Sequence, residues 1–141
     1  LNSLIAASVK FKFNLNIGCP KNYSPPKFVL NWVKKNKRKI NIFNNPKKAA
    51  KNADVVFTDK VVSLNDKGNK AKKLKDFKNF RIDASFMKFT RSGSIFLHCL
   101  PRGDEVDEKV FSSKQSKVWQ QALNRVHVQK SILLYCFDKL R

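Results

Sequence analysis

Three short apolar stretches, separated by segments with helical spacing, constrain the fold of the first part of the chain. They lie at 13–17, 39–43 and 53–58. The first two alternate apolar and polar residues as strands do, and the third is a continuous apolar run, typical of a strand buried on both faces. Helices are predicted between them, over 27–37 and 45–50. The order strand, helix, strand, helix, strand favours a parallel sheet flanked by helices.

The rest of the chain continues the same pattern. Further elements are predicted as helices over 2–11, 107–111 and 115–140 and as a strand over 95–98. Residues 66–79 form a Lys-rich stretch that predicts a loop followed by a solvated helix, with Leu74 and Phe77 as its apolar anchors. The last segment has apolar residues at spacings of three and four, which predicts a long amphipathic helix.

The net charge alone does not identify a binding partner. Thirty Lys and Arg residues stand against ten Asp and Glu, for a formal net charge of +20. Such a charge attracts polyanions through phosphate contacts, but an AT-rich coding bias also produces many Lys, Asn and Phe residues. We therefore expect nucleic acid to bind only non-specifically. Lys interrupts every apolar run well before the roughly 18 residues of a membrane span, so we expect no membrane insertion.

The cysteines favour neither a disulfide framework nor a zinc site. The chain has three, Cys19, Cys99 and Cys136, an odd number without a CxxC pair. We expect no metal and no cofactor. Free thiols fit the reducing cytoplasm best.

Two strand ends carry residues capable of chemistry. Asp59 follows the apolar run 53–58, and His98 and Cys99 end the strand predicted at 95–98. Ligands of open parallel sheets bind beyond the carboxyl ends of the strands, where these side chains would meet. Each also has a structural explanation: Asp59 as a helix cap, Cys99 as a small core residue and His98 as a group that satisfies local hydrogen bonds. Arg125, on the last predicted helix, is either a further site residue or a surface charge.

Taken together, these residues resemble the C-terminal half of ornithine carbamoyltransferases. The signature is His98-Cys99-Leu100-Pro101. Aspartate carbamoyltransferases have Pro where this chain has Cys99, so the resemblance points to ornithine. It runs from Asn2 to about Ser131. Further segments in register with the family lie at 2–4, 19–23, 54–59, 102, 105–111 and 121–127.

The resemblance implies a fold and a domain assignment. The fold class expected is α/β, a Rossmann-like three-layer domain with a mostly parallel sheet, the family domain's first strand missing and a long C-terminal helix. Residues 1–141 would be the C-terminal, ornithine-binding domain, truncated at its N-terminus, in a chain that looks cut from something longer. The family's phosphate-gripping loop lies in an N-terminal domain that these residues do not contain.

The resemblance also implies a reaction and a set of site residues. The family transfers the carbamoyl group of carbamoyl phosphate to the side-chain amine of ornithine, giving citrulline and phosphate, without a cofactor. Asp59 would hold the α-amino group of ornithine, and Ser63 and Leu64 would line its pocket. The family pattern would place Cys99 against the reacting amine and the carbamoyl group, and Leu100 and Arg125 against the carbamoyl group.

The chain departs from the family pattern at several positions. The loop after Asp59 lacks the family's Trp, with Leu64 in place of Met and Asn65 in place of Gly, and Leu123 replaces a Glu.

Ornithine, carbamoyl phosphate and a separately encoded N-terminal half are the expected partners, and family members are commonly homotrimers. The chain would be inactive alone. The alternatives are a non-catalytic remnant and a basic polyanion-binding module.

Overall fold

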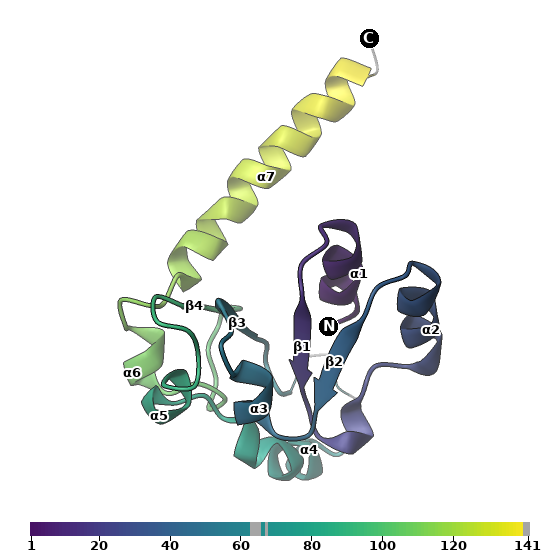
Figure 1. Ribbon diagram of the computed structural model, residues 1–141. Coiled ribbons are helices and arrows are strands. Elements are labelled where there is room, and N and C mark those ends of the chain that lie inside the picture. The colour runs from purple at the N-terminus through teal and green to yellow at the C-terminus, as the bar shows by residue number, and fades with distance from the viewer. Residues whose placement is uncertain (63–65, 67, 140–141) are drawn as a thin grey trace.

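Strands and helices follow one another in the predicted order. The computed structural model describes residues 1–62, 66 and 68–139, arranged as in Figure 1. The first half contains the helices α1 (Asn2–Lys10), α2 (Lys27–Lys35) and α3 (Pro46–Ala50), the 3-10 turn η1 (Lys21–Tyr23) and the strands β1 (Leu15–Gly18), β2 (Ile40–Phe43) and β3 (Val55–Thr58). The second half contains α4 (Lys70–Phe77), η2 (Lys78–Phe80), α5 (Ala84–Met87), β4 (Ile95–His98), α6 (Glu108–Phe111) and α7 (Val118–Lys139). Every predicted element is present, whereas α5 and the two 3-10 turns were not predicted.

Polar side chains cap the short helices at their N-termini. The Asn45 side chain accepts hydrogen bonds from the backbone N–H groups of Lys47 and Lys48 at the start of α3, where Pro46 is the first helical residue. Asn69, Asp83 and Asp107 cap α4, α5 and α6 in the same way. These caps satisfy N–H groups that have no partner within the helix, so they fix where each helix begins.

The parallel pair β1 and β2 has helices on both faces. Ile17 of β1 points to one face, where it packs into an apolar cluster with residues from α1 and α2. That cluster consists of Ile5, Val9, Ile17, Cys19, Val29 and Val33. On the other face Asn16 donates a 3.1 Å hydrogen bond to the Ala49 carbonyl of α3. A Cβ on Gly18 would lie 3.2 Å from the Cβ of Ala49, so a residue without a side chain allows α3 to approach. The three-layer arrangement is therefore confirmed.

The second parallel pair, β3 and β4, lies against a separate apolar core. This core consists of Ala50, Val56, Ile82, Phe86, Met87, Phe96, Val106 and Val110. Phe96 at its centre is fully buried. Loop backbone completes the pair at one edge, because the N–H of Phe96 donates to Gln115 and the carbonyl of Phe96 accepts from Lys117. The core fixes the position of the ends of β3 and β4, where the candidate site lies.

The prediction that 53–58 is buried on both faces is wrong. Val55 and Phe57, on the face of β3 opposite the core, are 48% and 43% exposed. Their partners in β4 are Ile95 and Leu97. An apolar run indicates that both faces of a strand suit burial, but only one face of β3 has a layer of described residues packed on it.

The described strands form two parallel pairs instead of one continuous sheet. β1 pairs with β2, and β3 pairs with β4, without any pairing between the two sets. The α/β class with parallel strands and flanking helices is confirmed. Within the residues described, β1, β2 and β3 each have one edge with which no strand pairs, and an isolated bridge from Phe96 to Ser116 lies at the outer edge of β4.

Helix α4 is held by Phe77, not by Leu74. The Phe77 ring lies 4.8 Å from the ring of Tyr23, centroid to centroid, and 5.6 Å from that of Phe80. Leu74 is 53% exposed, so its predicted anchoring role is wrong.

Helix α7 projects from the body of the molecule (Figure 1). Val118, at its first turn, is the one residue of the helix that is buried. The predicted helix is present, but its apolar positions from Trp119 to Phe137 are exposed. In the part of the chain that the structure describes, we find no helix of the length and hydropathy needed to cross a bilayer.

Candidate functional site

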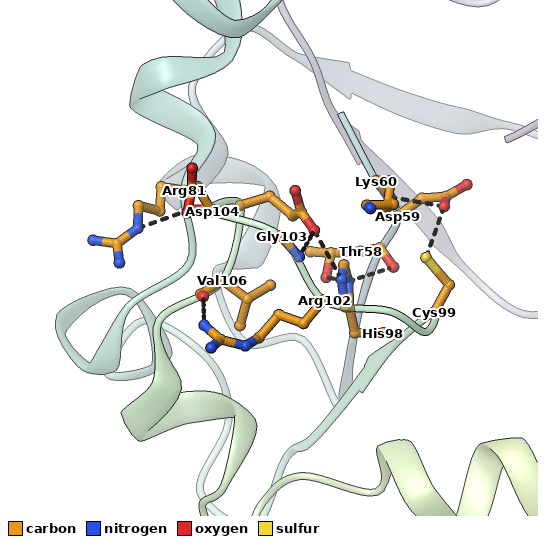
Figure 2. A network of polar contacts seen from close by, with 11 residues as sticks. Thr58, Asp59, Lys60, Arg81, His98, Cys99, Arg102, Gly103, Asp104 and Val106 are labelled. Carbon is orange, nitrogen blue, oxygen red and sulfur yellow. Dashed lines mark hydrogen bonds and ion pairs between the residues drawn. The ribbon is translucent and has the colours of Figure 1, made fainter. Parts of the chain in front are cut away.

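Asp59 and Cys99 are the residues that directly follow β3 and β4. The two parallel strands end at the same level, because Thr58 and His98 are register partners. The chain therefore leaves both strands at one edge of the pair, and the next residue in each case carries a reactive side chain. Figure 2 shows Asp59 and Cys99 turned toward each other there. The prediction that these strand ends meet is confirmed.

The Cys99 thiol donates a hydrogen bond to the carboxylate of Asp59. The distance from Cys99 Sγ to Asp59 Oδ1 is 3.1 Å, and the same oxygen accepts a 2.8 Å hydrogen bond from the backbone N–H of Lys60. No helix begins at Asp59 in the described residues 60–62, so its carboxylate is not a helix cap. Cys99 is half-buried at the surface and is not a core residue. Both structural explanations for these two residues are therefore wrong.

The surroundings of Cys99 hold its thiol in the protonated form. Burial raises the pKa of Cys99 most, and the hydrogen bond to Asp59 raises it further. The Lys60 N–H lowers this pKa, and the negative charges of Asp59 and Glu105 add smaller increases. A thiolate is the nucleophilic and metal-binding form of Cys. Cys99 is thus suited to donate a weak hydrogen bond or to contact an amine. Within the described residues, no group of three or more His, Cys, Asp or Glu side chains could hold a metal ion.

His98 is a buried residue with a polar partner at each ring nitrogen. Its Nδ1 lies 2.8 Å from Thr58 Oγ1 and 3.2 Å from the Thr58 carbonyl oxygen. Its Nε2 lies 3.1 Å from Glu105 Oε1. The expectation that His98 satisfies local hydrogen bonds is confirmed. The ring is enclosed by the core side chains Phe96 and Phe111.

The loop after Cys99 is folded back on itself by its charged residues. Arg102 donates a 2.9 Å hydrogen bond to the Val106 carbonyl and forms a 2.7 Å ion pair with Glu108, and these contacts hold it beside α6. Leu100, joined to Pro101 by a cis peptide bond, is 42% exposed. Arg102 therefore shapes the loop.

The remaining predicted site residues are not brought together with this pair. Arg125 lies on the exposed part of α7, and no hydrogen bond or ion pair of the described residues joins it to Asp59 or Cys99. Ser63 and Leu64 lie outside the described residues. The roles assigned to these three residues and to Leu100 stay predictions.

Thr58 and Glu105 also belong to the polar network, although neither is among the predicted site residues. The signal for Thr58 was its place directly before Asp59, which matches the place of His98 before Cys99. Glu105 gave no comparable signal, because its contact with His98 depends on the course of the loop between them.

Comparisons with known proteins identify the family of the chain. The family profile described as "Aspartate/ornithine carbamoyltransferase, Asp/Orn binding domain" matches residues 1–136. An ornithine carbamoyltransferase of Methanocorpusculum labreanum is 38% identical over 135 residues, which is 94% of this chain and 44% of that protein. One from Rhodopseudomonas palustris is 40% identical over 139 residues, or 96% of this chain and 44% of that protein.

A solved structure shows the same arrangement of elements. The anabolic ornithine carbamoyltransferase of Campylobacter jejuni superposes with a TM-score of 0.89 at 33% identity, covering 99% of this chain and 48% of that one. The chain thus spans a little under half the length of the relatives it matches. Because the family profile covers nearly all of its residues, the chain belongs to the aspartate/ornithine carbamoyltransferase family.

Proposed function

We propose that this chain supplies the ornithine-binding half of an ornithine carbamoyltransferase. The observation that carries the proposal is the Asp59–Cys99 pair, joined by a 3.1 Å hydrogen bond at the carboxyl ends of two parallel strands. A carboxylate at such an edge suits the α-ammonium group of an amino acid. Cys99 stands where the aspartate-specific relatives have Pro, so its thiol distinguishes the two substrates.

Each proposed contact uses a distinct property of its side chain. Asp59 binds the α-amino group of ornithine, and Ser63 and Leu64 line the same pocket. Cys99, held protonated, lies against the side-chain amine and the carbamoyl group, where a thiol fits an apolar chain that ends in a nitrogen. The Leu100 carbonyl orients the carbamoyl amide, and the Arg125 guanidinium stabilises the carbamoyl oxygen as negative charge develops there.

The reaction proposed is a nucleophilic substitution at the carbamoyl carbon. The neutral side-chain amine of ornithine attacks this carbon, a tetrahedral intermediate forms, and the bond to the phosphate oxygen breaks. The amine loses a proton, and the products are citrulline and phosphate. The protein contributes orientation and charge stabilisation.

The proposal assigns the other half of the site to a region outside residues 1–141. The support is that the chain spans only 44% to 48% of the relatives compared. We propose that the region that grips the phosphate belongs to an N-terminal half, encoded separately or in a longer polypeptide, and that residues 1–141 alone are inactive. A trimeric assembly and a cytoplasmic location belong to the same proposal.

Ligand binding by the chain tests the proposal directly. We expect L-ornithine to shift backbone amide NMR signals of residues 58–62, 98–100 and 102, and L-aspartate to leave them in place. Asp59→Asn should weaken ornithine binding at least tenfold, because the charge-assisted contact is lost. Asp54→Asn is the matched control, since Asp54 pairs with Arg91 at the opposite end of β3. Equal shifts with both amino acids, or equal affinity of D59N and D54N, would refute the assignment.

A turnover assay tests whether catalysis needs a second half. The chain alone should form no citrulline from ornithine and carbamoyl phosphate, whereas adding a polypeptide that carries the N-terminal half of the Campylobacter jejuni enzyme should give citrulline. Turnover by the chain alone would disprove the need for a second half.

A basic polyanion-binding role is the second candidate. The formal charge of +20 and the exposed lysines of α4, Lys70, Lys72 and Lys75, favour contact with phosphate groups. Such binding depends on the release of counterions and weakens steeply as salt rises. Binding to duplex DNA that persists at physiological salt would favour this role over the carbamoyltransferase one.

A further inference from the structure

We propose that Glu105, acting through His98, holds Cys99 at hydrogen-bond distance from Asp59. Glu105 and His98 would then be positioning residues of the ornithine site. The relevance of the pair to ornithine rests on the proposed function, but the positioning itself is a property of the folded chain.

The side chains of Thr58 and His98 connect the two strand ends. Thr58 and Asp59 are neighbours in the chain, as are His98 and Cys99, and Thr58 faces His98 in the strand register. The contacts of His98 Nδ1 with Thr58, at 2.8 and 3.2 Å, join the side chains one residue before the reactive pair. Any shift of His98 relative to Thr58 therefore changes the distance between Cys99 and Asp59.

Glu105 fixes the other side of the His98 ring. Glu105 Oε1 lies 3.1 Å from His98 Nε2 and also accepts a 2.7 Å hydrogen bond from the N–H of Gly103. Oε1 of Glu105 therefore joins the His98 ring to the backbone of Gly103. These contacts hold the two ends of the segment from Cys99 to Glu105 together.

Burial makes these contacts strong restraints. The side chain of His98 is fully buried and that of Glu105 is 10% exposed. Buried polar groups that lose a partner are costly, because water does not replace the lost hydrogen bond. In this orientation each ring nitrogen of His98 has a polar partner, Nδ1 at Thr58 and Nε2 at Glu105. Turning the ring away would remove both contacts.

The backbone of the loop depends on the same carboxylate. A Cβ on Gly103 would lie 2.7 Å from Glu105 Oε2, so the carboxylate occupies the space that a side chain at this position would need. Val106, the next residue, is fully buried in the core. Glu105 thus lies between a fixed core residue and the ring of His98.

The test measures the alkylation rate of each cysteine in the folded chain with iodoacetamide, resolved by peptide mass spectrometry. Glu105→Ala removes the acceptor oxygen, while Glu105→Gln removes the charge but keeps an oxygen that can accept from His98 and Gly103. Both variants change the electrostatic field at Cys99 equally, so the ratio of their rates isolates the hydrogen bonds. Buried Cys19 reports opening of the first core, and exposed Cys136 is the reference for reagent reactivity.

We expect Cys99 in E105A to react about fivefold faster than Cys99 in E105Q, the change in a local opening equilibrium that one neutral hydrogen bond of average strength makes. Cys19 and Cys136 should react at equal rates in the two variants. Equal Cys99 rates, or a parallel rise at Cys19, would overturn the proposal, since the second result indicates general loss of stability.

A second pair of variants tests the other side of the ring. Thr58→Val removes the hydroxyl that contacts Nδ1, whereas Thr58→Ser keeps a hydroxyl at this position. Cys99 should react faster in T58V than in T58S, again with Cys19 unchanged, and identical Cys99 rates would count against the proposal. Neither measurement uses a substrate, so failure to bind ornithine would refute the proposed function and leave this inference standing.

Discussion

The hydroxyl of Tyr23 donates a 3.0 Å hydrogen bond to the carboxylate of Asp76, 53 residues later in the chain. This bond joins the turn after β1 to helix α4, and the Tyr23 and Phe77 rings pack beside it. Loss of hydration and the contact with Asp76 raise the pKa of Tyr23, so the hydroxyl keeps its proton at neutral pH. The Lys-rich helix is thereby held against the first core.

Tyr23→Phe should loosen α4 without disturbing the first core. The ring contact with Phe77 survives, but the hydrogen bond to Asp76 is lost. We expect amide hydrogen exchange of 70–77 to rise severalfold, because α4 then opens more readily. Tyr135→Phe on the exposed helix α7 is the matched control and should leave these amides unchanged. Unaltered exchange in Y23F would show that the ring contact alone holds the helix.

Asp59→Asn should lower the pKa of Cys99. Asp59 raises this pKa in two ways, as acceptor of the thiol hydrogen bond and by its negative charge. An amide removes the charge and accepts the hydrogen bond less strongly, whereas the effect of burial, the largest cause, remains. The pH dependence of Cys99 alkylation should move to lower pH, and that of Cys136 should not move. In the control Asp54→Asn the Cys99 profile should match that of the unsubstituted chain.

Phe96→Ala should destabilise the second core. Phe96 is fully buried between β3 and the loop around Gln115, and Phe→Ala changes in cores cost about 3–5 kcal/mol. Urea unfolding followed by tryptophan fluorescence measures the loss. Phe28→Ala, at a side chain 71% exposed, should change stability far less. Should F96A fail to fold, Phe96→Leu gives a smaller loss in the same direction, and a loss no larger than that of F28A would contradict the assignment of this core.

Binding of the chain to duplex DNA should collapse as salt increases. Each phosphate neutralised by Lys or Arg adds to the slope of affinity against salt. Fluorescence anisotropy should show binding at low salt and its loss at physiological salt, independent of sequence. Replacing Lys70, Lys72 and Lys75 of α4 with Gln should make the slope shallower. An unchanged slope would place the DNA contacts on another face.

The helices and strands were predictable because their signals are local. Apolar alternation placed β1 and β2, and Asn45-Pro46 marked the start of α3 by a cap and an imino acid that suits the first helical turn. The four residues of α5 escaped prediction, since a helix of one turn has too few positions to show a period. Its cap at Asp83 was the available signal.

The exposure of particular residues was not predictable from the same signals. Phe57 has the character of a core residue, and whether its face of β3 is covered depends on which segments pack there, a property of the whole assembly of elements. Leu74 and Phe77 are equally apolar, but only Phe77 has a partner ring within reach.

The candidate site was predicted as far as its residues lie at strand ends. The meeting of Asp59 and Cys99 follows from the rule that parallel strands carry their carboxyl ends to one edge. The contact of Glu105 with His98 depends on how a seven-residue interval folds back, for which the sequence carries no periodic signal. Arg125 lies on α7, and its distance from the strand ends depends on the direction in which that helix leaves the body.

The free edges of β1, β2 and β3 affect how copies of the chain behave in solution. An uncovered strand edge offers backbone donors and acceptors to any extended segment of another copy. The formal charge of +20 opposes such encounters, because like-charged copies repel each other over the Debye length, which is about 10 Å at 0.1 M salt. The resistance of the chain to self-association therefore depends on ionic strength. Salt that weakens binding to polyanions also screens the repulsion between copies, so their uncovered strand edges meet more often.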